Sequence, residues 1–173
     1  MKKNVVSLLV IVMSIFVITG CNGSKIGTAP DGSEVDVEKG TMKFIKEYEA
    51  GGYKLLPTEE LNKWIGENKD MVIVDTMPAD YYGKGHIPGA VNAELPATSL
   101  VDATEDQISS FIELLGEDKS KPIVVYCGFV SCARSDVGAV IAMEQGFTEV
   151  YRVPGGIAAW QQAGYEIEKN NKN

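Results

Sequence analysis

The chain has 173 residues, of which 45% are hydrophobic, and a formal net charge of -8. This length allows one compact domain with an appendage and leaves no room for a second full-sized core. The scattered basic residues argue against nucleic acid or an anionic lipid surface as a partner bound through grouped charge. With one histidine and three cysteines, a Cys/His zinc site would need ligands from distant segments, so neither a metal nor a cofactor is expected.

The N-terminus is predicted to be an export signal. Two lysines precede an apolar stretch at residues 5–18, which is short for a membrane-spanning helix. The ending Ile-Thr-Gly-Cys resembles a bacterial lipoprotein signal, in which cleavage removes residues 1–20 and leaves Cys21 lipid-modified. That resemblance implies an exported lipoprotein, anchored to a membrane of the bacterial cell envelope. The alternative is an uncleaved anchor with an incidental cysteine.

Two different segments are predicted to follow the signal. Residues 21–40 are rich in glycine, serine and charged side chains, which is typical of a flexible tether. Residues 41–52 place apolar side chains at helical spacing and end in two glycines. We therefore expect a short amphipathic helix that lies against the domain.

Residues 53–168 are predicted to alternate strands and helices. Strands are expected at residues 53–56, 71–75, 123–126 and 149–153, and the turn-rich link at residues 81–93 is expected to lead into a further short strand. Helices are expected after Pro57 with Thr58 as N-cap, after a Thr104/Gln107 capping box, from Arg134 to near Gly146, and at residues 157–163. This alternation indicates an α/β fold with a parallel sheet. Residues 169–173 are expected to form a disordered tail.

The sequence PIVVYCGFVSCARS at residues 122–135 is the main candidate for a functional site. A β-branched run ends at Cys127, a short loop carries Cys132, and Arg134 opens a predicted helix. Backbone N–H groups and the helix dipole at such a junction favour a thiolate or a bound anion. A thiolate is the reactive form of cysteine, so this junction is a candidate device for holding a reactive thiolate or an anion.

Three segments in this order resemble a single-domain rhodanese over residues 53–168. They are GHIPGAVN at residues 85–92, the VVYC strand and loop, and VYRVPGGIAAW at residues 150–160. The resemblance implies a three-layer sandwich, with a parallel sheet between helices on both faces. It also implies a sulfurtransferase whose loop cysteine carries a sulfane sulfur as a persulfide. The donor would be a small sulfur-containing anion such as thiosulfate, and the acceptor a thiol or cyanide.

The resemblance assigns roles to several residues. Cys127 would be the catalytic nucleophile, and His86 and Asp75 would support the site by ordering backbone groups. Arg134 would either bind an oxyanion donor or make a structural bond to loop carbonyls or to Asp75. The residues expected to surround the substrate are Gly128, Phe129, Val130, Ser131, Ala133, Arg134 and Ser135.

The loop departs from the typical sulfurtransferase pattern in ways that leave the substrate open. Six residues separate Cys127 from Arg134, where four are typical, and Met77 stands where many members carry an arginine. Cys132 lies five positions after Cys127 and can reach disulfide distance. It would act as a resolving thiol or form a permanent structural disulfide.

Three functions therefore remain open. The first is a sulfurtransferase that uses Cys127. The second is a thiol-disulfide or oxyanion reductase that uses Cys127 and Cys132 together with a reductant. The third is a non-catalytic binding module. The oligomeric state also stays open.

Overall fold

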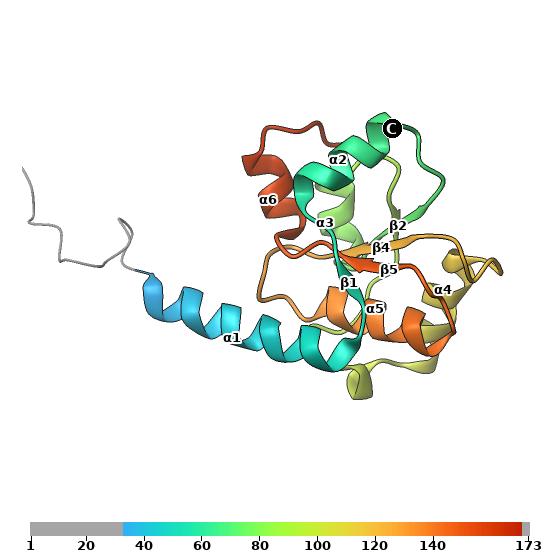
Figure 1. The fold of residues 1–173 in the computed structure, drawn as a ribbon, viewed down its shortest axis with the longest axis horizontal. Coiled ribbons are helices and arrows are strands. Elements are labelled where there is room, and N and C mark those ends of the chain that lie inside the picture. The colour runs from blue at the N-terminus through green and yellow to red at the C-terminus, as the bar shows by residue number, and fades with distance from the viewer. Residues whose placement is uncertain (1–32, 171–173) are drawn as a thin grey trace, which may run out of the picture. The chain divides into compact units, whose positions relative to one another are not determined.

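Five short segments pair into one parallel sheet in the computed structural model, which describes residues 33–170 (Figure 1). The strands lie in the order β1-β5-β4-β2-β3. Their bounds are Lys54–Leu55 for β1, Val72–Asp75 for β2, Val91–Asn92 for β3, Ile123–Tyr126 for β4 and Val150–Arg152 for β5. The predicted α/β fold with a parallel sheet is confirmed.

The central strand β4 is buried on both faces. The side chains of Ile123 and Val125 belong to one apolar cluster, and those of Val124 and Tyr126 belong to the other. All four residues are 0% exposed. A continuous apolar run is what a parallel strand covered on both faces requires.

Helices cover both faces of the sheet, which confirms the three-layer arrangement (Figure 1). The helices are α1 (Glu34–Gly51), α2 (Thr58–Gly66), α3 (Ala79–Lys84), α4 (Glu105–Leu115), α5 (Arg134–Glu144) and α6 (Gly156–Gln162), with a short 3₁₀ turn, η1, at Leu100–Asp102. Buried residues of α4 and α5 pack on one face of the sheet, and those of α2 and α6 pack on the other.

The two predicted helix caps have different outcomes. The Thr104 side chain accepts from Gln107 N, and the Gln107 side chain accepts from Thr104 N, so the capping box is confirmed. The prediction that Thr58 caps α2 is wrong, because Pro57 occupies the cap position and Thr58 is already helical. The carbonyl of Pro57 accepts from Leu61 N at 3.0 Å, which starts the helix one residue earlier.

Helix α1 begins at Glu34, so the expectation that residues 34–40 belong to a flexible tether is wrong. Gly40 and Phe44 lie one helical turn apart, and both have a packing partner. A Cβ atom on Gly40 would lie 3.2 Å from Ser131 Cβ, and the Phe44 ring lies 4.7 Å from the Arg152 guanidinium carbon. Packing against the domain therefore extends the helix beyond the stretch whose periodicity predicts it.

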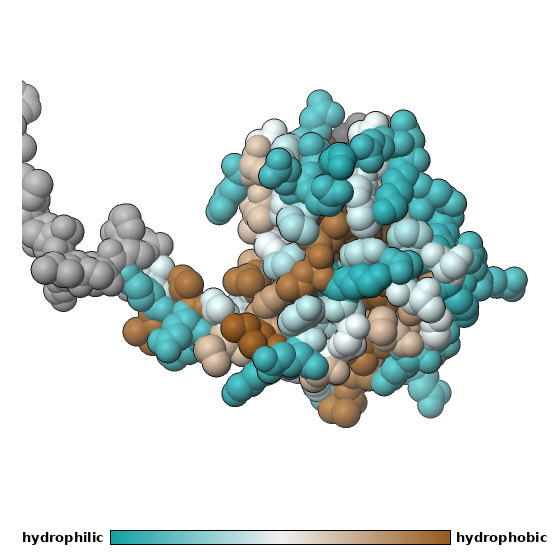
Figure 2. All heavy atoms as spheres, in the orientation of Figure 1, coloured by the Kyte–Doolittle hydropathy of each residue, from teal (hydrophilic) through white to brown (hydrophobic). Residues whose placement is uncertain are grey.

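Some apolar side chains of α1 remain exposed, as Figure 2 shows. Val35 is 62% exposed and Val37 is 60% exposed. Within residues 33–170, no helix is both long and apolar enough to cross a membrane. The predicted signal, Cys21 and the first part of the tether lie outside the described residues, as do residues 171–173 of the predicted tail.

Candidate functional site

The loop between β4 and α5 contains two joined cysteines. Cys127 directly follows β4 and forms a disulfide with Cys132, with 6.3 Å between their Cα atoms. The prediction that Cys132 reaches disulfide distance is confirmed. Cys127 is 2% exposed, whereas Cys132 is only partly buried. Cys132 is therefore the more solvent-exposed residue of the disulfide.

Helix α6 holds the start of this loop. The carbonyl of Cys127 accepts from Ile157 N at 2.9 Å, and that of Gly128 accepts from Ala158 N at 3.0 Å. Gly156 makes this approach possible, because it has a φ of +54° and a Cβ atom on it would lie 2.1 Å from the Cys127 oxygen. The motif at residues 150–160 supports the family resemblance, but its contact with Cys127 was not predicted.

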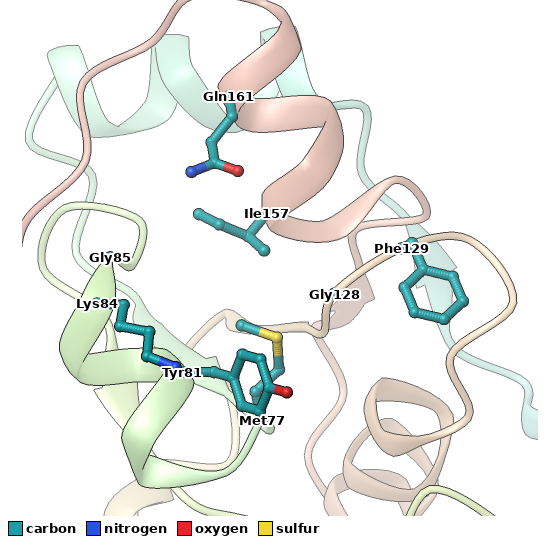
Figure 3. Close-up of a pocket in the computed structure, with 8 residues that line it drawn as sticks. All are labelled: Met77, Tyr81, Lys84, Gly85, Gly128, Phe129, Ile157 and Gln161. Carbon is teal, nitrogen blue, oxygen red and sulfur yellow. The ribbon is translucent and has the colours of Figure 1, made fainter.

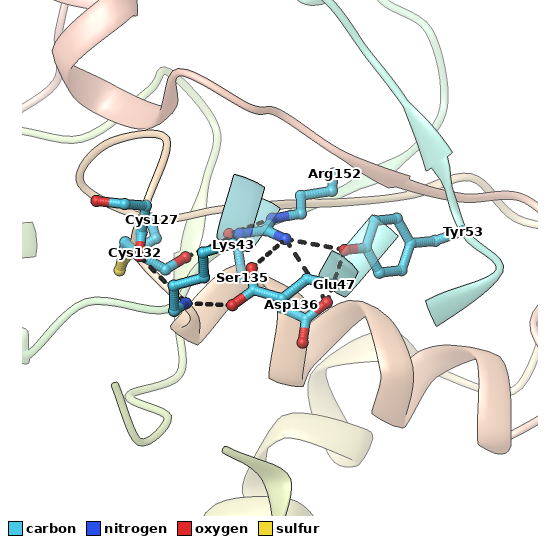
Figure 4. Close-up of polar contacts among 9 residues, drawn as sticks. Lys43, Glu47, Tyr53, Cys127, Cys132, Ser135, Asp136 and Arg152 are labelled. Carbon is cyan, nitrogen blue, oxygen red and sulfur yellow. Dashed lines mark hydrogen bonds and ion pairs between the residues drawn. A yellow bond between two sulfur atoms is a disulfide. The ribbon is translucent and has the colours of Figure 1, made fainter. Parts of the chain in front are cut away.

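Arg152 holds the other end of the loop from the end of β5 (Figure 4). Its side chain is 1% exposed, and its guanidinium donates to the carbonyl of Cys132 at 2.9 Å. It also donates to Ser135 Oγ at 3.0 Å, to Glu47 Oε2 at 2.9 Å and to Tyr53 Oη at 2.8 Å. A buried cation needs this number of acceptors, because an unpaired buried charge is costly.

Asp136 completes the set of groups around Arg152. Its Oδ1 lies 3.6 Å from the guanidinium and accepts from Tyr53 Oη at 2.6 Å. Burial raises the pKa of Asp136, while the Tyr53 bond and the Arg152 charge oppose that change. Burial and the bond to Asp136 raise the pKa of Tyr53, so its phenol stays protonated and can donate.

Sequence reasoning missed the role of Arg152. The available signal was its rarity, because the chain has only two arginines and this one lies next to the last residue of a predicted strand. Ligands of α/β proteins gather at the carboxyl ends of the strands, so a charge there merited attention. Its partner Glu47 comes from α1, and nothing in the local pattern of α1 predicts that pairing.

Arg134 makes a structural bond. Its guanidinium donates to the carbonyl of Leu95 and lies 4.0 Å from Glu94 Oε1. A structural bond of Arg134 was expected to reach a carbonyl of the cysteine loop or Asp75. It reaches the Leu95 carbonyl instead, in the segment after β3. Arg134 still lines the cavity beside the disulfide, where it supplies positive charge.

Two adjoining cavities open next to the loop. The first has a volume of about 390 Å³ and is lined by both cysteines and by Arg134, among other residues. The second, shown in Figure 3, has a volume of about 330 Å³ and extends toward Lys84. The residues shared by the two cavities are Met77, Tyr81, Gly128 and Phe129. Thioether and aromatic groups thus form much of the mouth around the disulfide.

The predicted substrate-binding residues take several positions. Gly128, Phe129, Ser131 and Arg134 line the first cavity. Val130 is 39% exposed, Ala133 is buried just before α5, and the buried Ser135 hydroxyl accepts from Arg152. Binding of a substrate by these residues stays a prediction.

The two supporting residues occupy structural positions. Asp75 is fully buried at the end of β2 and accepts from Met77 N at 2.8 Å through Oδ1, as expected for a group that orients backbone. Burial raises the pKa of Asp75, and the Met77 bond opposes this. His86 Nδ1 lies 3.0 Å from the Tyr82 carbonyl, and its ring stacks on Tyr82 with centroids 3.8 Å apart. The predicted contact between His86 and backbone is confirmed.

Similar curated proteins come from different functional classes. An HTH-type transcriptional regulator of Mycobacterium tuberculosis is 32% identical over 103 residues, which cover 60% of this chain and 40% of the regulator. A tRNA uridine(34) hydroxylase of Photorhabdus laumondii is 30% identical over 112 residues, which cover 64% of this chain and 29% of the hydroxylase. The chain thus spans less than half the length of these relatives.

Solved structures share the fold at lower identity. A thiosulfate sulfurtransferase from Pseudomonas aeruginosa has a TM-score of 0.60 and 19% identity, covering 82% of this chain and 26% of that one. A polysulfide-sulfur transferase homodimer from Wolinella succinogenes has a TM-score of 0.56 and 18% identity, covering 84% and 97%. Residues 57–163 also match the family model described as a rhodanese-like domain. This match covers more than half of the chain, which therefore belongs to the rhodanese-like family.

Proposed function

We propose that the protein is a two-cysteine sulfurtransferase, in which Cys127 accepts a sulfane sulfur and Cys132 resolves the persulfide. The observation that carries this proposal is the Cys127–Cys132 disulfide at the carboxyl end of β4. Parallel α/β sheets place their ligands at this edge. Two cysteines that meet at this edge can react in sequence, because the thiolate of one can attack the sulfur of the other and displace the group that this sulfur carries.

The first step loads the sulfur. The Cys127 thiolate attacks the outer sulfur of a donor such as thiosulfate and forms a new S–S bond. The S–S bond of the donor breaks, and its electron pair leaves on sulfite. Cys127 then carries a persulfide, and no net oxidation has occurred.

The persulfide has two routes forward. An acceptor thiolate can attack the outer sulfur, which restores the Cys127 thiolate and leaves the acceptor persulfidated. Alternatively, Cys132 attacks the inner sulfur, on Cys127, and hydrosulfide leaves with the electron pair. The second route produces the disulfide, and an external dithiol must then reduce it while becoming a disulfide itself.

The cavity favours donors with an apolar part. Met77, Tyr81 and Phe129 line it, and Arg134 provides its cationic end. Arg134 is also bonded to the Leu95 carbonyl, so only part of its donor capacity faces a ligand. Organic persulfides and organic polysulfides fit this combination better than thiosulfate does, because a small dianion gains little from apolar walls.

A second candidate function uses the same disulfide. A thiol-disulfide or oxyanion reductase would need a solvent-reachable cysteine for an incoming dithiol, and Cys132 is the more exposed member of the pair. In that reaction the Cys132 sulfur accepts the attacking thiolate, and Cys127 leaves as a thiolate. Sulfur loading of Cys127 would then play no part.

A single-turnover experiment separates the two functions. Reduced protein, freed of reductant, is mixed with excess thiosulfate, and sulfite and sulfide are measured. The proposal predicts one sulfite and one sulfide per protein, only sulfite from Cys132→Ser, and neither from Cys127→Ser. The same protein is also tested with polysulfide and with an organic persulfide, and sulfide is measured. If the unaltered protein releases no sulfite from thiosulfate and no sulfide from the other two donors, sulfur transfer is rejected and the reductase remains.

We also propose that the protein is an exported lipoprotein anchored through Cys21. The apolar stretch and the Ile-Thr-Gly-Cys ending support this, and a disulfide persists more readily outside the cytoplasm. Cells that express the full chain should incorporate labelled palmitate into it, and Cys21→Ser should abolish the label. Retention of label in that variant would contradict the assignment.

A further inference from the structure

Helix α1 contacts the cysteine loop, although it precedes the family-matched residues 57–163. Lys43 Nζ donates to the carbonyl of Ser131 at 3.3 Å. One turn earlier, a Cβ atom on Gly40 would lie 3.2 Å from Ser131 Cβ, so the helix and loop backbones approach closely. The cysteine loop is therefore contacted by a helix that lies outside the family-matched residues.

A second contact reaches the next carbonyl of the loop through Arg152 (Figure 4). Glu47 of α1 accepts from the Arg152 guanidinium at 2.9 Å and also pairs with Lys43. The same guanidinium donates to the Cys132 carbonyl at 2.9 Å. The Arg152 side chain is 1% exposed and the Glu47 side chain 14%, so water does little to weaken this pair.

We propose that Lys43, Glu47 and Arg152 are positioning residues that hold the Ser131 and Cys132 carbonyls and so keep the Cys132 sulfur beside Cys127. The two carbonyls belong to the peptide planes on either side of the Cys132 Cα, so holding both restricts the direction in which the Cys132 side chain extends. This inference rests on the proposed function, because it explains how a loop two residues longer than usual still delivers its second thiol. Within residues 33–170, the polar contacts of these three side chains with the loop go to backbone carbonyls and not to either cysteine sulfur.

The positioning has a measurable consequence in the disulfide equilibrium. Oxidation by glutathione disulfide removes two electrons and two protons from Cys127 and Cys132 and yields two molecules of glutathione. A loop already held in the disulfide geometry raises the effective concentration of one thiol at the other. Loosening the loop should therefore shift the equilibrium toward the dithiol.

The experiment measures this equilibrium constant in glutathione buffers, with the fraction oxidised determined by thiol trapping. The test variants are Glu47→Gln and Lys43→Met. Matched controls are Glu49→Gln and Lys46→Met, which make the same charge changes at exposed positions of the same helix. We expect the constant to fall about threefold to tenfold for Glu47→Gln and about twofold for Lys43→Met, with no change in the controls.

Two features keep the test decisive. Lys43→Met leaves the buried Arg152 and Glu47 in place, so it gives a result even if Glu47→Gln does not fold. Urea titration first verifies that each variant folds. In a folded variant, the loss of a purely structural contact would leave the disulfide equilibrium unchanged. Test variants that fold and match their controls would overturn the proposal.

The result is also independent of sulfur transfer, because no sulfur donor is present. A shifted equilibrium in a protein that never forms a persulfide would retain the positioning role and reject the proposed function. An unshifted equilibrium in an active sulfurtransferase would reject the positioning role and retain the proposed function.

Discussion

Gly156 lies so close to Cys127 that a Cβ atom on the glycine would be 2.1 Å from the cysteine carbonyl oxygen. The same region carries the bond from Ile157 N to that oxygen, at 2.9 Å. The first turn of α6 therefore fixes where the cysteine loop leaves β4. Any side chain at Gly156 would push the loop and the helix apart.

Gly156→Ala should be strongly destabilising. The positive φ of Gly156 costs an alanine about 1 to 2 kcal/mol, and the clash with backbone adds to this. Gly164→Ala is the matched control, because Gly164 also has a positive φ of +76° but no atom within 4 Å of its Cβ position. Urea unfolding should show a loss for Gly156→Ala that exceeds the loss for Gly164→Ala. Equal losses would mean that the contact with Cys127 does not constrain the loop.

Arg134→Ala should affect stability more than donor binding. Loss of the hydrogen bond from the charged guanidinium to the Leu95 carbonyl should lower the free energy of unfolding by about 1 to 3 kcal/mol. The KM for thiosulfate should rise less than tenfold, because the guanidinium is already engaged. Arg134→Lys keeps the charge and serves as the comparison in both assays. A large rise in KM with unchanged stability would instead identify Arg134 as an anion ligand.

Met77→Arg should improve the use of small anionic donors. Met77 lines both cavities beside Cys127, so a guanidinium at this position would add positive charge at their shared mouth. We expect the kcat/KM for thiosulfate to rise severalfold, while that for an apolar organic persulfide falls or stays level. Met77→Leu, which keeps the apolar wall, should change neither value by much. A lower kcat/KM for thiosulfate in Met77→Arg would contradict this view of the cavity.

Asp75 should make the protein less stable as the pH rises from acid to neutral. Burial raises the pKa of Asp75 above the value of about 3.9 for an unfolded aspartate, so the folded state binds the proton more tightly. Its contribution to stability is greatest below the unfolded pKa and decreases as the pH rises through the raised one.

Asp75→Asn tests this sign. Asparagine keeps an acceptor for Met77 N and removes the carboxylate, so the variant should gain stability relative to the unaltered protein as the pH rises from 4 toward 8. Urea titrations across this range give the difference. Asp80→Asn, at an exposed position, is the control. A relative loss of stability toward neutral pH would show that the ionised Asp75 is favoured in the fold.

The strands β2 and β4 were predictable because their apolar runs are short and bounded by turn residues. Residues 123–126 coincide with β4, and the buried run at residues 71–75 contains β2. The position of Cys127 directly after such a run is what predicted that it belongs to the functional site. The helix α3 was missed, because its six residues, ADYYGK, show no apolar face that periodicity could detect.

The loop-holding contacts were beyond local patterns. The pairing of Arg152 with Glu47 joins residues 105 positions apart, and its stabilisation comes from burial that only the folded chain produces. The bond from Arg134 to Leu95 likewise spans 39 positions. Residue type indicated that these arginines needed acceptors, but the fold decides which carbonyls and carboxylates provide them.

The central claim is that Cys127 carries the transferred sulfur, and intact-mass measurement tests it most directly. The Cys132→Ser domain, reduced and freed of reductant, is incubated with thiosulfate or with polysulfide and then weighed by mass spectrometry. We predict a gain of one sulfur atom that a dithiol removes, and no gain in the Cys127→Ser variant. An unchanged mass with both donors, or an equal gain in both variants, would contradict the account.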